Sequence, residues 1–320
     1  MARIAIKEAP QETLKPISTR KHTPNHLQKE QVAGYVFLIP WFLGFIVFTI
    51  GPILGSLYLS FTHYDLLSAP RWLGLDNYIN MFQDERWQHA VRVTIGYVFL
   101  SVPFKIAFAL LLALILKRGL TSIGLYRAIY YVPSLLGGSV AIAILWRQIF
   151  DSDGVVNQFL RLFGIPANQS WIANPDYALS TLVLLSIWQF GSPMIIFLAG
   201  LKQIPTEYYE AAQTDGAGRL RIFFRITLPL LTPLIFFNLV MQMVEAFQAF
   251  TPAFIISNGQ GSPLDSTLLY TLYVYQQGFG SLHMGYASAM AWTLLIAIAS
   301  ITALAFQTSR FWVFYQDERS

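Results

Sequence analysis

The chain has 320 residues, of which 55% are hydrophobic and only 12% are charged. Soluble globular proteins carry about 25% charged residues, so this chain has too few to cover a water-soluble fold. The same apolar composition excludes intrinsic disorder, which requires low hydrophobicity and high net charge. The formal net charge is +4 and there is no cysteine, which excludes disulfide scaffolds and thiolate metal sites. The composition therefore predicts a membrane protein.

Six stretches are apolar and long enough to cross a bilayer, which requires about 20 residues in a helix. They are predicted at about residues 33–61, 93–116, 124–146, 177–201, 227–257 and 286–307. The resulting fold is all-α, with a transmembrane domain over 33–308 between tails at 1–32 and 309–320. Prolines recur inside these stretches: Pro40, Pro52, Pro103, Pro133, Pro193, Pro233 and Pro252. We expect them to bend the helices, either as ordinary kinks tolerated in lipid or as bends that line a pathway.

The basic residues predict the orientation of the spans, because lysine and arginine concentrate on the cytoplasmic side. With the amino terminus placed inside, 15 of the 21 lysine and arginine residues fall in cytoplasmic segments and five fall outside. Lys105 is the one that lies within a span, the second. We therefore expect both termini to be cytoplasmic.

The loop at 202–229, between the fourth and fifth spans, has the local signals of two short helices. Pro205 and Thr206 suit a helix start, and Glu210 lies near the positive end of the helix dipole. Gly216 is the predicted stop, because glycine adopts the left-handed backbone conformation at low cost. A second helix is expected to lead into the fifth span.

The same loop contains the pattern Glu-Ala-Ala, three residues, Gly, nine residues, Ile, one residue, Leu-Pro. It resembles the EAA loop of binding-protein-dependent ABC importer permeases at every position: Glu210, Ala211, Ala212, Gly216, Ile226, Leu228 and Pro229. In that family, the short helix docks into an ATP-binding subunit and transmits its closure to the membrane helices. The resemblance implies that these seven residues form the ATPase-coupling loop. The alternative is an amphipathic interfacial hairpin without a partner.

Three further regions resemble the carbohydrate-uptake branch of these permeases, the maltose and glycerol-phosphate type. They are residues 127–133, residues 246–250 with 257–263, and residues 284–290. The resemblance covers about residues 30–310, with a core type-1 transmembrane region at about 90–308. It implies the six-helix type I importer permease fold, also called MetI-like. The chain departs from the family at Gly261-Ser262-Pro263, where Gly-Gly-Pro is usual.

Glu245 is the only acidic residue in the fifth span. Because a charge at membrane depth is costly, such a residue usually faces protein or a water-filled cavity. Two roles remain open for it: a contact for a sugar hydroxyl, or a structural partner of Lys105 or of a second permease subunit. Gln242, Gln248 and Asn238 are candidates for the same substrate pathway. Four aromatic residues could stack on sugar rings or simply pack: Trp188, Phe190, Phe247 and Phe250.

The sequence contains no Gly-x-x-x-x-Gly-Lys-Ser/Thr phosphate loop. Its five histidines are scattered outside the spans, so we expect no catalytic residue and no metal site. The resemblance implies a non-enzymatic subunit without a cofactor of its own, with ATP and Mg bound by partner subunits.

The resemblance further implies a permease that imports a sugar or oligosaccharide across the bacterial plasma membrane by alternating access. Its expected partners are two ATP-binding subunits, a second permease subunit in a heterodimer and an extracytoplasmic solute-binding protein, with no role for nucleic acid. One alternative is the same machinery carrying another solute, such as glycerol phosphate. The other is a stand-alone channel or secondary carrier, which would have no use for the EAA loop.

Overall fold

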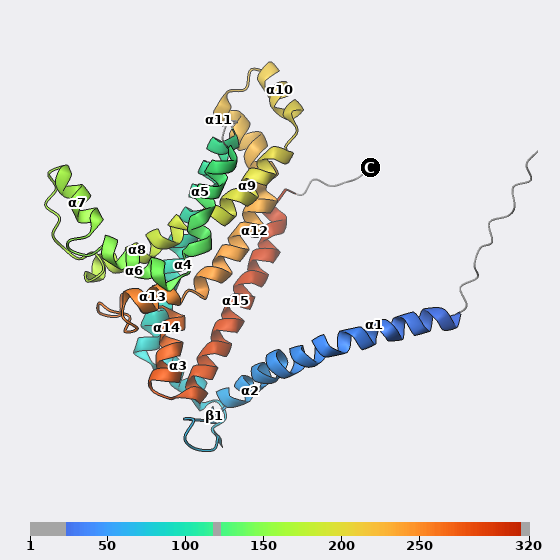
Figure 1. The fold of residues 1–320 in the computed structure, drawn as a ribbon, viewed down its shortest axis with the longest axis vertical. Coiled ribbons are helices and arrows are strands. Elements are labelled where there is room, and N and C mark those ends of the chain that lie inside the picture. Colours follow the sequence, from blue (N-terminus) through green and yellow to red (C-terminus); the bar gives the residue numbers. More distant parts are fainter. Residues whose placement is uncertain (1–23, 118–122, 315–320) are drawn as a thin grey trace, which may run out of the picture. The chain divides into compact units, whose positions relative to one another are not determined.

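The structure, a computed structural model, describes residues 24–117 and 123–314 (Figure 1). Most of the predicted amino-terminal tail, at 1–23, and half of the predicted carboxyl-terminal tail, at 315–320, lie outside these ranges. The chain divides into two units, residues 1–55 and residues 56–320, which are described in turn.

The described part of the first unit, from Pro24, is one helical run. It consists of α1 (Pro24–Phe45), the π-helical turn η1 (Ile46–Ile50) and the start of α2 (Gly51–Ser60). The wide turn directly precedes Pro52, whose ring would clash with the carbonyl four residues earlier in a regular α-helix. None of the side chains at 35–55 is buried, as expected for an apolar helix that faces lipid or another chain.

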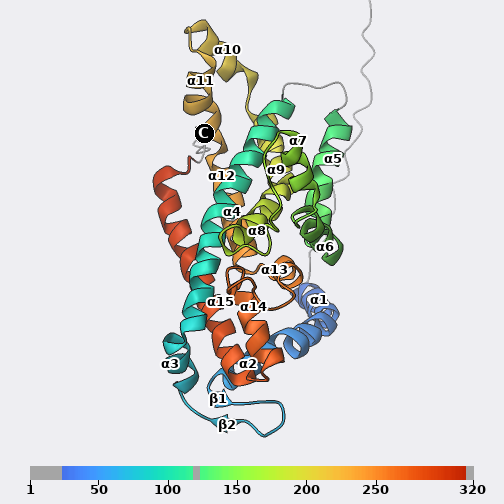
Figure 2. The same ribbon diagram turned by 90° about the vertical axis from the view of Figure 1, so that its left-hand side faces the viewer.

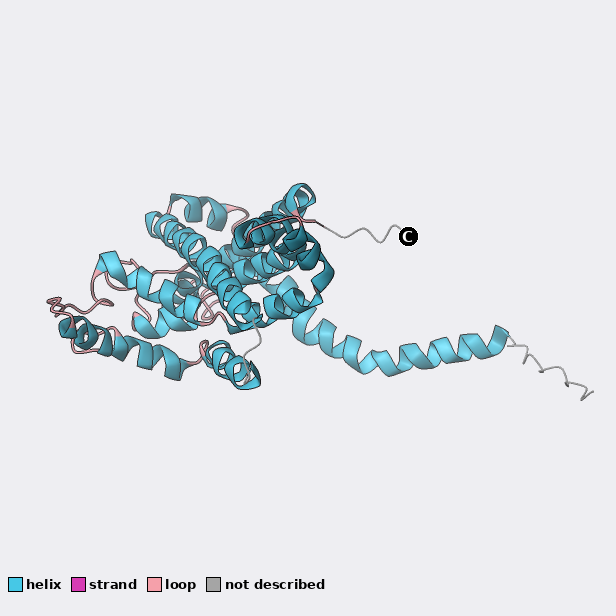
Figure 3. Cartoon of the chain, turned by 90° about the horizontal axis from the view of Figure 1, so that it is seen from above, coloured by secondary structure: helices cyan, strands magenta, loops and turns pink. Residues whose placement is uncertain are grey.

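The second unit opens with an antiparallel pair of short strands, β1 (Thr62–His63) and β2 (Arg71–Trp72), followed by α3 (Asp76–Gln83). The helices of its first half are α4 (Glu85–Lys117), α5 (Ile123–Leu136), α6 (Val140–Ile149), α7 (Val155–Leu162), α8 (Pro175–Trp188) and α9 (Gly191–Gln203). Those of its second half are α10 (Thr206–Thr214), α11 (Arg219–Ile222), η2 (Phe223–Thr227), α12 (Leu228–Phe247), α13 (Thr251–Ile256), α14 (Tyr270–Tyr275), η3 (Gln276–Gly280) and α15 (Met284–Trp312). Helices joined by loops account for nearly all of the described chain (Figure 3).

Within the described ranges, four helical segments are long and apolar enough to cross a membrane: Tyr35–Ser60, Glu85–Lys117, Arg219–Ile256 and Met284–Trp312. Two bent pairs also qualify when each pair is taken as one span. They are α5 with α6, bent by 99°, and α8 with α9, bent by 41°. Counted in this way, the described ranges contain six candidate spans, each overlapping a predicted one. The prediction of an all-α, multi-pass membrane protein is confirmed.

One of the two bends falls at a predicted proline. Pro193 lies four residues after Gln189, in the first turn of α9 directly after the break from α8, and its ring would clash with the Gln189 carbonyl in a continuous helix. The sharper bend, between α5 and α6, falls at Gly137-Gly138 instead.

Gly137 follows α5, and a Cβ atom there would lie 2.2 Å from Cγ of Gln189, the residue after α8. The hydroxyl of Ser134 donates to the carbonyl oxygen of Gln189 (2.9 Å) and accepts from the amide of Ser192 (3.0 Å). These bonds satisfy backbone groups at the break between α8 and α9, as a helix interrupted inside lipid requires.

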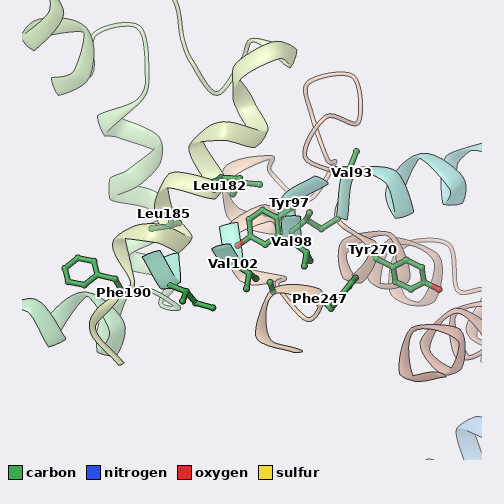
Figure 4. Packing of buried hydrophobic residues seen from close by; sticks show 14 of the residues in the cluster. Val93, Tyr97, Val98, Val102, Leu182, Leu185, Phe190, Phe247 and Tyr270 are labelled. Carbon is green, nitrogen blue, oxygen red and sulfur yellow. The ribbon is translucent and has the colours of Figure 1, made fainter. Parts of the chain in front are cut away.

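Helix α4 is the centre of the core. It packs against α8, α9, α12 and α14, and its fully buried Ala109 and Ala113 permit close approach. Figure 4 shows Tyr97 and Val102 of this helix in the apolar cluster that also contains Leu182 of α8. With 33 residues, α4 is about 50 Å long. It therefore extends beyond a hydrocarbon layer of about 30 Å.

The second unit has two distinct ends (Figures 1 and 2). Helices α10 and α11 lie at one end, and the carboxyl-terminal part of α15 points the same way. Helix α3 and strand β1 lie at the opposite end. The loop that carries the EAA pattern is therefore at an extremity of the helical bundle.

Candidate functional site

The EAA loop folds as a helix, a glycine stop and a second helix, which confirms the local prediction. The amide of Ala217 donates to the carbonyl oxygen of Ala212 (2.9 Å), and that of Gly216 donates to Gln213 (3.0 Å). This pair of bonds is the Schellman arrangement at a helix end. Gly216 has φ +75°, and a Cβ atom there would meet nothing within 4 Å. Glycine is needed at this position for its backbone conformation and not for space.

The seven pattern residues divide into an exposed group and a packed group. Glu210, Ala211 and Gly216 are exposed, and Ala212 is half-buried. The other three are half-buried where the chain enters α12: Ile226, Leu228 and Pro229.

Helix α10 has no buried residue. A nine-residue helix is too short to be stable on its own in water, so its contacts and caps must hold it. Beyond the stop, Leu220 is 76% exposed and Phe224 is 59% exposed. Large apolar side chains gathered on an exposed loop mark a contact with another protein or with the membrane surface.

A cavity of about 310 Å³ lies where α4, α12 and α13 meet the two bends. Its polar lining comes from Tyr97, Lys105, Ser186, Gln189, Gln242, Glu245, Gln248 and Thr251. Three of the four predicted pathway residues are therefore together. The fourth, Asn238, does not line the cavity: it is 1% exposed, and its amide donates to the carbonyl oxygen of Leu234 (2.9 Å).

Glu245 and Lys105 form an ion pair across the cavity, with Oε2 and Nζ 3.7 Å apart. The lysine side chain is 5% exposed and the glutamate side chain is 58% exposed. The structural role left open for Glu245 is thus present in the structure. The same carboxylate also faces the open cavity, so a ligand could reach it.

Gln242 is 8% exposed, and its Oε1 atom has no hydrogen-bond donor in the part of the chain that the structure describes. A buried acceptor without a donor costs roughly 1–3 kcal/mol. A ligand hydroxyl or a water molecule in the cavity would supply that donor.

The structure adds lining residues that pattern reasoning missed. Ser186 and Gln189 reach the cavity because α8 breaks directly after Trp188, and Gly138 lines it from the other bend. The only local signal was the Gly137-Gly138 pair. Of the four aromatic candidates, only Phe250 lines the cavity.

The other three aromatic candidates belong to the packed interior. Phe190 and Phe247 are buried in the core, and the ring of Trp188 packs 5.8 Å from that of Trp146.

At the end opposite the EAA loop, Asp84 joins three helices. Its carboxylate accepts from the hydroxyls of Tyr273 (2.5 Å) and Tyr286 (2.8 Å) and from the amides of Arg86 and Trp87. Burial acts to raise the pKa of Asp84, but these hydrogen bonds outweigh it and hold the pKa below its usual 3.8. Burial raises the pKa of Tyr273, which keeps its proton for this bond. This junction fastens the start of α4 to α14 and α15.

The described ranges contain no group of three His, Asp or Glu side chains placed to hold a metal ion.

Comparison with known proteins places residues 78–311 in the family described as binding-protein-dependent transport system inner membrane component. The probable ABC transporter permease protein YesP of Bacillus subtilis (strain 168) is 53% identical over 293 residues, covering 91% of this chain and 95% of YesP. The lactose transport system permease protein LacF of Rhizobium radiobacter is 31% identical over 284 residues, covering 87% and 94%. A chain of a bacterial alginate ABC transporter, solved in complex with an alginate pentasaccharide-bound periplasmic protein, has the same fold. Its TM-score is 0.78 at 24% identity, over 89% of this chain and 96% of that one.

Proposed function

Because the chain belongs to the family of binding-protein-dependent transport system inner membrane components, we propose that it is a permease subunit of an ATP-driven importer. The observation that carries the proposal is the complete EAA pattern on an exposed helix–glycine–helix loop at one end of a multi-pass chain. A stand-alone carrier has no use for such a loop.

The substrate in this proposal is a sugar or oligosaccharide. LacF, a permease named for lactose transport, aligns over most of both chains, which supports this class. The cavity is consistent with it: Glu245 and Gln242 offer acceptors to hydroxyl groups, and Ser186 and Gln248 offer further hydrogen-bonding groups. Glycerol phosphate remains an alternative cargo for the same machinery.

The ATP-binding subunits are expected to dock on α10 and α11, which places this end of the bundle in the cytoplasm. The exposed Leu220 and Phe224 side chains would be covered by that contact. ATP hydrolysis belongs to these partners, since the chain has no phosphate loop. A second permease would complete the pathway, and a solute-binding protein would deliver substrate at the opposite end, where α3 lies.

The mechanism that follows is alternating access. ATP binding closes the two nucleotide-binding subunits, α10 moves with them, and the cavity turns outward to receive substrate. The Lys105–Glu245 pair links α4 to α12 beside the bound ligand, so ligand contact with Glu245 would be sensitive to the position of both helices.

The test is co-purification of the tagged, detergent-solubilised chain from its native membranes, followed by mass spectrometry of the proteins that accompany it. We expect the wild type to bring down an ATP-binding subunit and a second permease. Glu210→Lys should lose the ATP-binding subunit and keep the second permease, because it reverses the charge on the exposed face of α10.

The matched control is Asp215→Lys, the same reversal of charge at an exposed position that the pattern leaves free. It should retain both partners. A wild-type chain that purifies alone, and still moves solute when reconstituted in liposomes, would contradict the proposal in favour of an independent carrier.

A further inference from the structure

Tyr209 connects α10 to the rest of the bundle by two contacts. The Nζ atom of Lys117 lies over its ring, 4.0 Å from the centroid. Its hydroxyl lies 3.3 Å from Oγ1 of Thr227, within hydrogen-bonding distance. Tyr209 is half-buried, whereas the residues on either side, Tyr208 and Glu210, are exposed.

The two partners of Tyr209 end the two helices that build the polar wall of the cavity. Lys117 is the last residue of α4, 12 residues after Lys105, and Thr227 is the residue before α12, 18 residues ahead of Glu245. At 1.5 Å per residue, these separations are about 18 Å and 27 Å along the helices. The far ends of both stretches meet in the Lys105–Glu245 pair. Polar contacts therefore connect α4 and α12 at two places, once in the cavity and once through Tyr209.

We propose that Tyr209 is a positioning residue that delivers the movement of α10 to α4 and α12 together, and so couples nucleotide binding to the shape of the cavity. The inference rests on the proposed coupling function of the EAA loop. It adds Tyr209, a residue outside the EAA pattern, as the side chain that connects α10 to α4 and α12.

The surroundings of the contact support a transmitting role over a purely local one. Thr227 is 5% exposed, and Lys117 is half-buried beside Leu116, which is 1% exposed, so both contacts lie at helix ends that pack against the core. The backbone also connects α10 to α12, through the turn at 215–218 and the continuous helix that begins at Arg219. The contacts of Tyr209 differ from this route because they reach α4 as well as the start of α12.

The chemistry of the contact predicts which substitutions preserve it. The attraction of a cation to an aromatic face requires the ring but not the hydroxyl. Tyr209→Phe should therefore keep the contact to Lys117 and lose only the one to Thr227. Tyr209→Leu loses both contacts while remaining apolar.

The absence of cysteine from the chain allows a single reporter to be introduced. Ser186→Cys places a thiol in the lining of the cavity. The measurement is the rate at which a membrane-impermeant fluorescent maleimide labels this chain in the complex purified from native membranes. The rate is compared without nucleotide and after trapping with ATP and vanadate.

In the otherwise wild-type complex, we expect trapping to change the labelling rate by about fivefold or more, the lower end of ordinary allosteric coupling. Tyr209→Leu should abolish this change while the complex stays assembled and continues to hydrolyse ATP. Tyr209→Phe should retain part of it. Lys117→Gln removes the contact to the ring and keeps the one to Thr227, so it should also retain part of the change. Adding it to Tyr209→Leu should have no further effect, because that variant already lacks both contacts.

The matched control is Lys202→Gln, which removes an exposed lysine from the last turn of the neighbouring helix α9, and it should leave the response intact. A normal response in assembled Tyr209→Leu would overturn the inference. Failure of the proposed function itself would look different: no ATP-binding subunit would co-purify, and even the wild type would show no response to nucleotide.

Discussion

The ion pair between Glu245 and Lys105 joins an exposed side chain to a buried one. The lysine is enclosed, while the glutamate opens to the cavity. An enclosed charge depends on its partner far more than an accessible one does, since water can replace the partner only at the accessible site. The two residues are therefore expected to respond unequally to substitution.

We predict that Glu245→Met destabilises the chain, because it leaves the enclosed charge of Lys105 without its partner. The expected loss is about 1–3 kcal/mol, below the 3–5 kcal/mol typical of fully buried pairs. Lys105→Met should cost less, since the cavity can solvate Glu245. The double variant should recover stability relative to Glu245→Met. Thermal unfolding of the solubilised complex measures these changes in stability. The assignment would be contradicted if the two single variants lost equal stability and if the two losses added in the double variant.

Gly216 offers a second test at the same scale. Its left-handed backbone costs a residue with a side chain about 1–2 kcal/mol, although there is free space around it. Gly216→Val should weaken recovery of the ATP-binding subunit by about 5–30-fold, because the end of α10 is displaced. Gly216→Asn should be close to wild type, since asparagine tolerates this conformation. If valine and asparagine behaved alike in a co-purification titration, the helix stop would not be what the partner requires.

The bends between helices depend in part on contacts between residues far apart in the chain, which local sequence rules do not predict. Proline appears inside α4, α5 and α12, yet these helices continue through it. Pro193, by contrast, lies at the break between α8 and α9. Both bends also bring a glycine into close contact, Gly137 with Gln189 and Gly191 with the backbone of Tyr130. Each of those pairs is separated by more than 50 residues in the chain, so the need for glycine becomes visible only when the helices are packed.

The loop at 202–229 could be predicted because its signals are local. A helix start at Thr206 and a left-handed stop at Gly216 depend only on neighbouring residues. The cavity could be predicted in part. Gln242 and Asn238 are four residues apart and share a face of α12. At Asn238, one turn from Gln242, packed side chains cover that face. The spacing of residues in the sequence indicates which face of a helix they share, but it does not determine how deeply each of them is buried.

The junction at Asp84 gives a prediction at the scale of helices. Its lowered pKa means that its contribution to stability is fully present above pH 3.8 and is lost as the pH falls through the lower folded-state value. Asp84→Asn should lower the unfolding temperature at neutral pH, and its difference from wild type should shrink below pH 3.8. Asp76→Asn, at an exposed position in α3, is the control. A difference that stays constant with pH would show that the charge of Asp84 is not what holds these helices.

In the second unit, the spans, the exposed loop and the polar cavity form one arrangement. The loop lies at one end of the second unit, the Asp84 junction lies towards the other, and α4 runs between them. The cavity is bordered by α4 and by both bends. A force applied at α10 therefore has a continuous helical route to the residues that would contact substrate.

In the proposed assembly, this chain is a membrane subunit and separate ATPases drive transport. The composition of the complex can be measured by native mass spectrometry after extraction from its own membranes. We expect one copy of this chain with one second permease and two ATP-binding subunits. A chain found free of any ATP-binding subunit, in conditions that leave other membrane complexes intact, would contradict the proposed assembly.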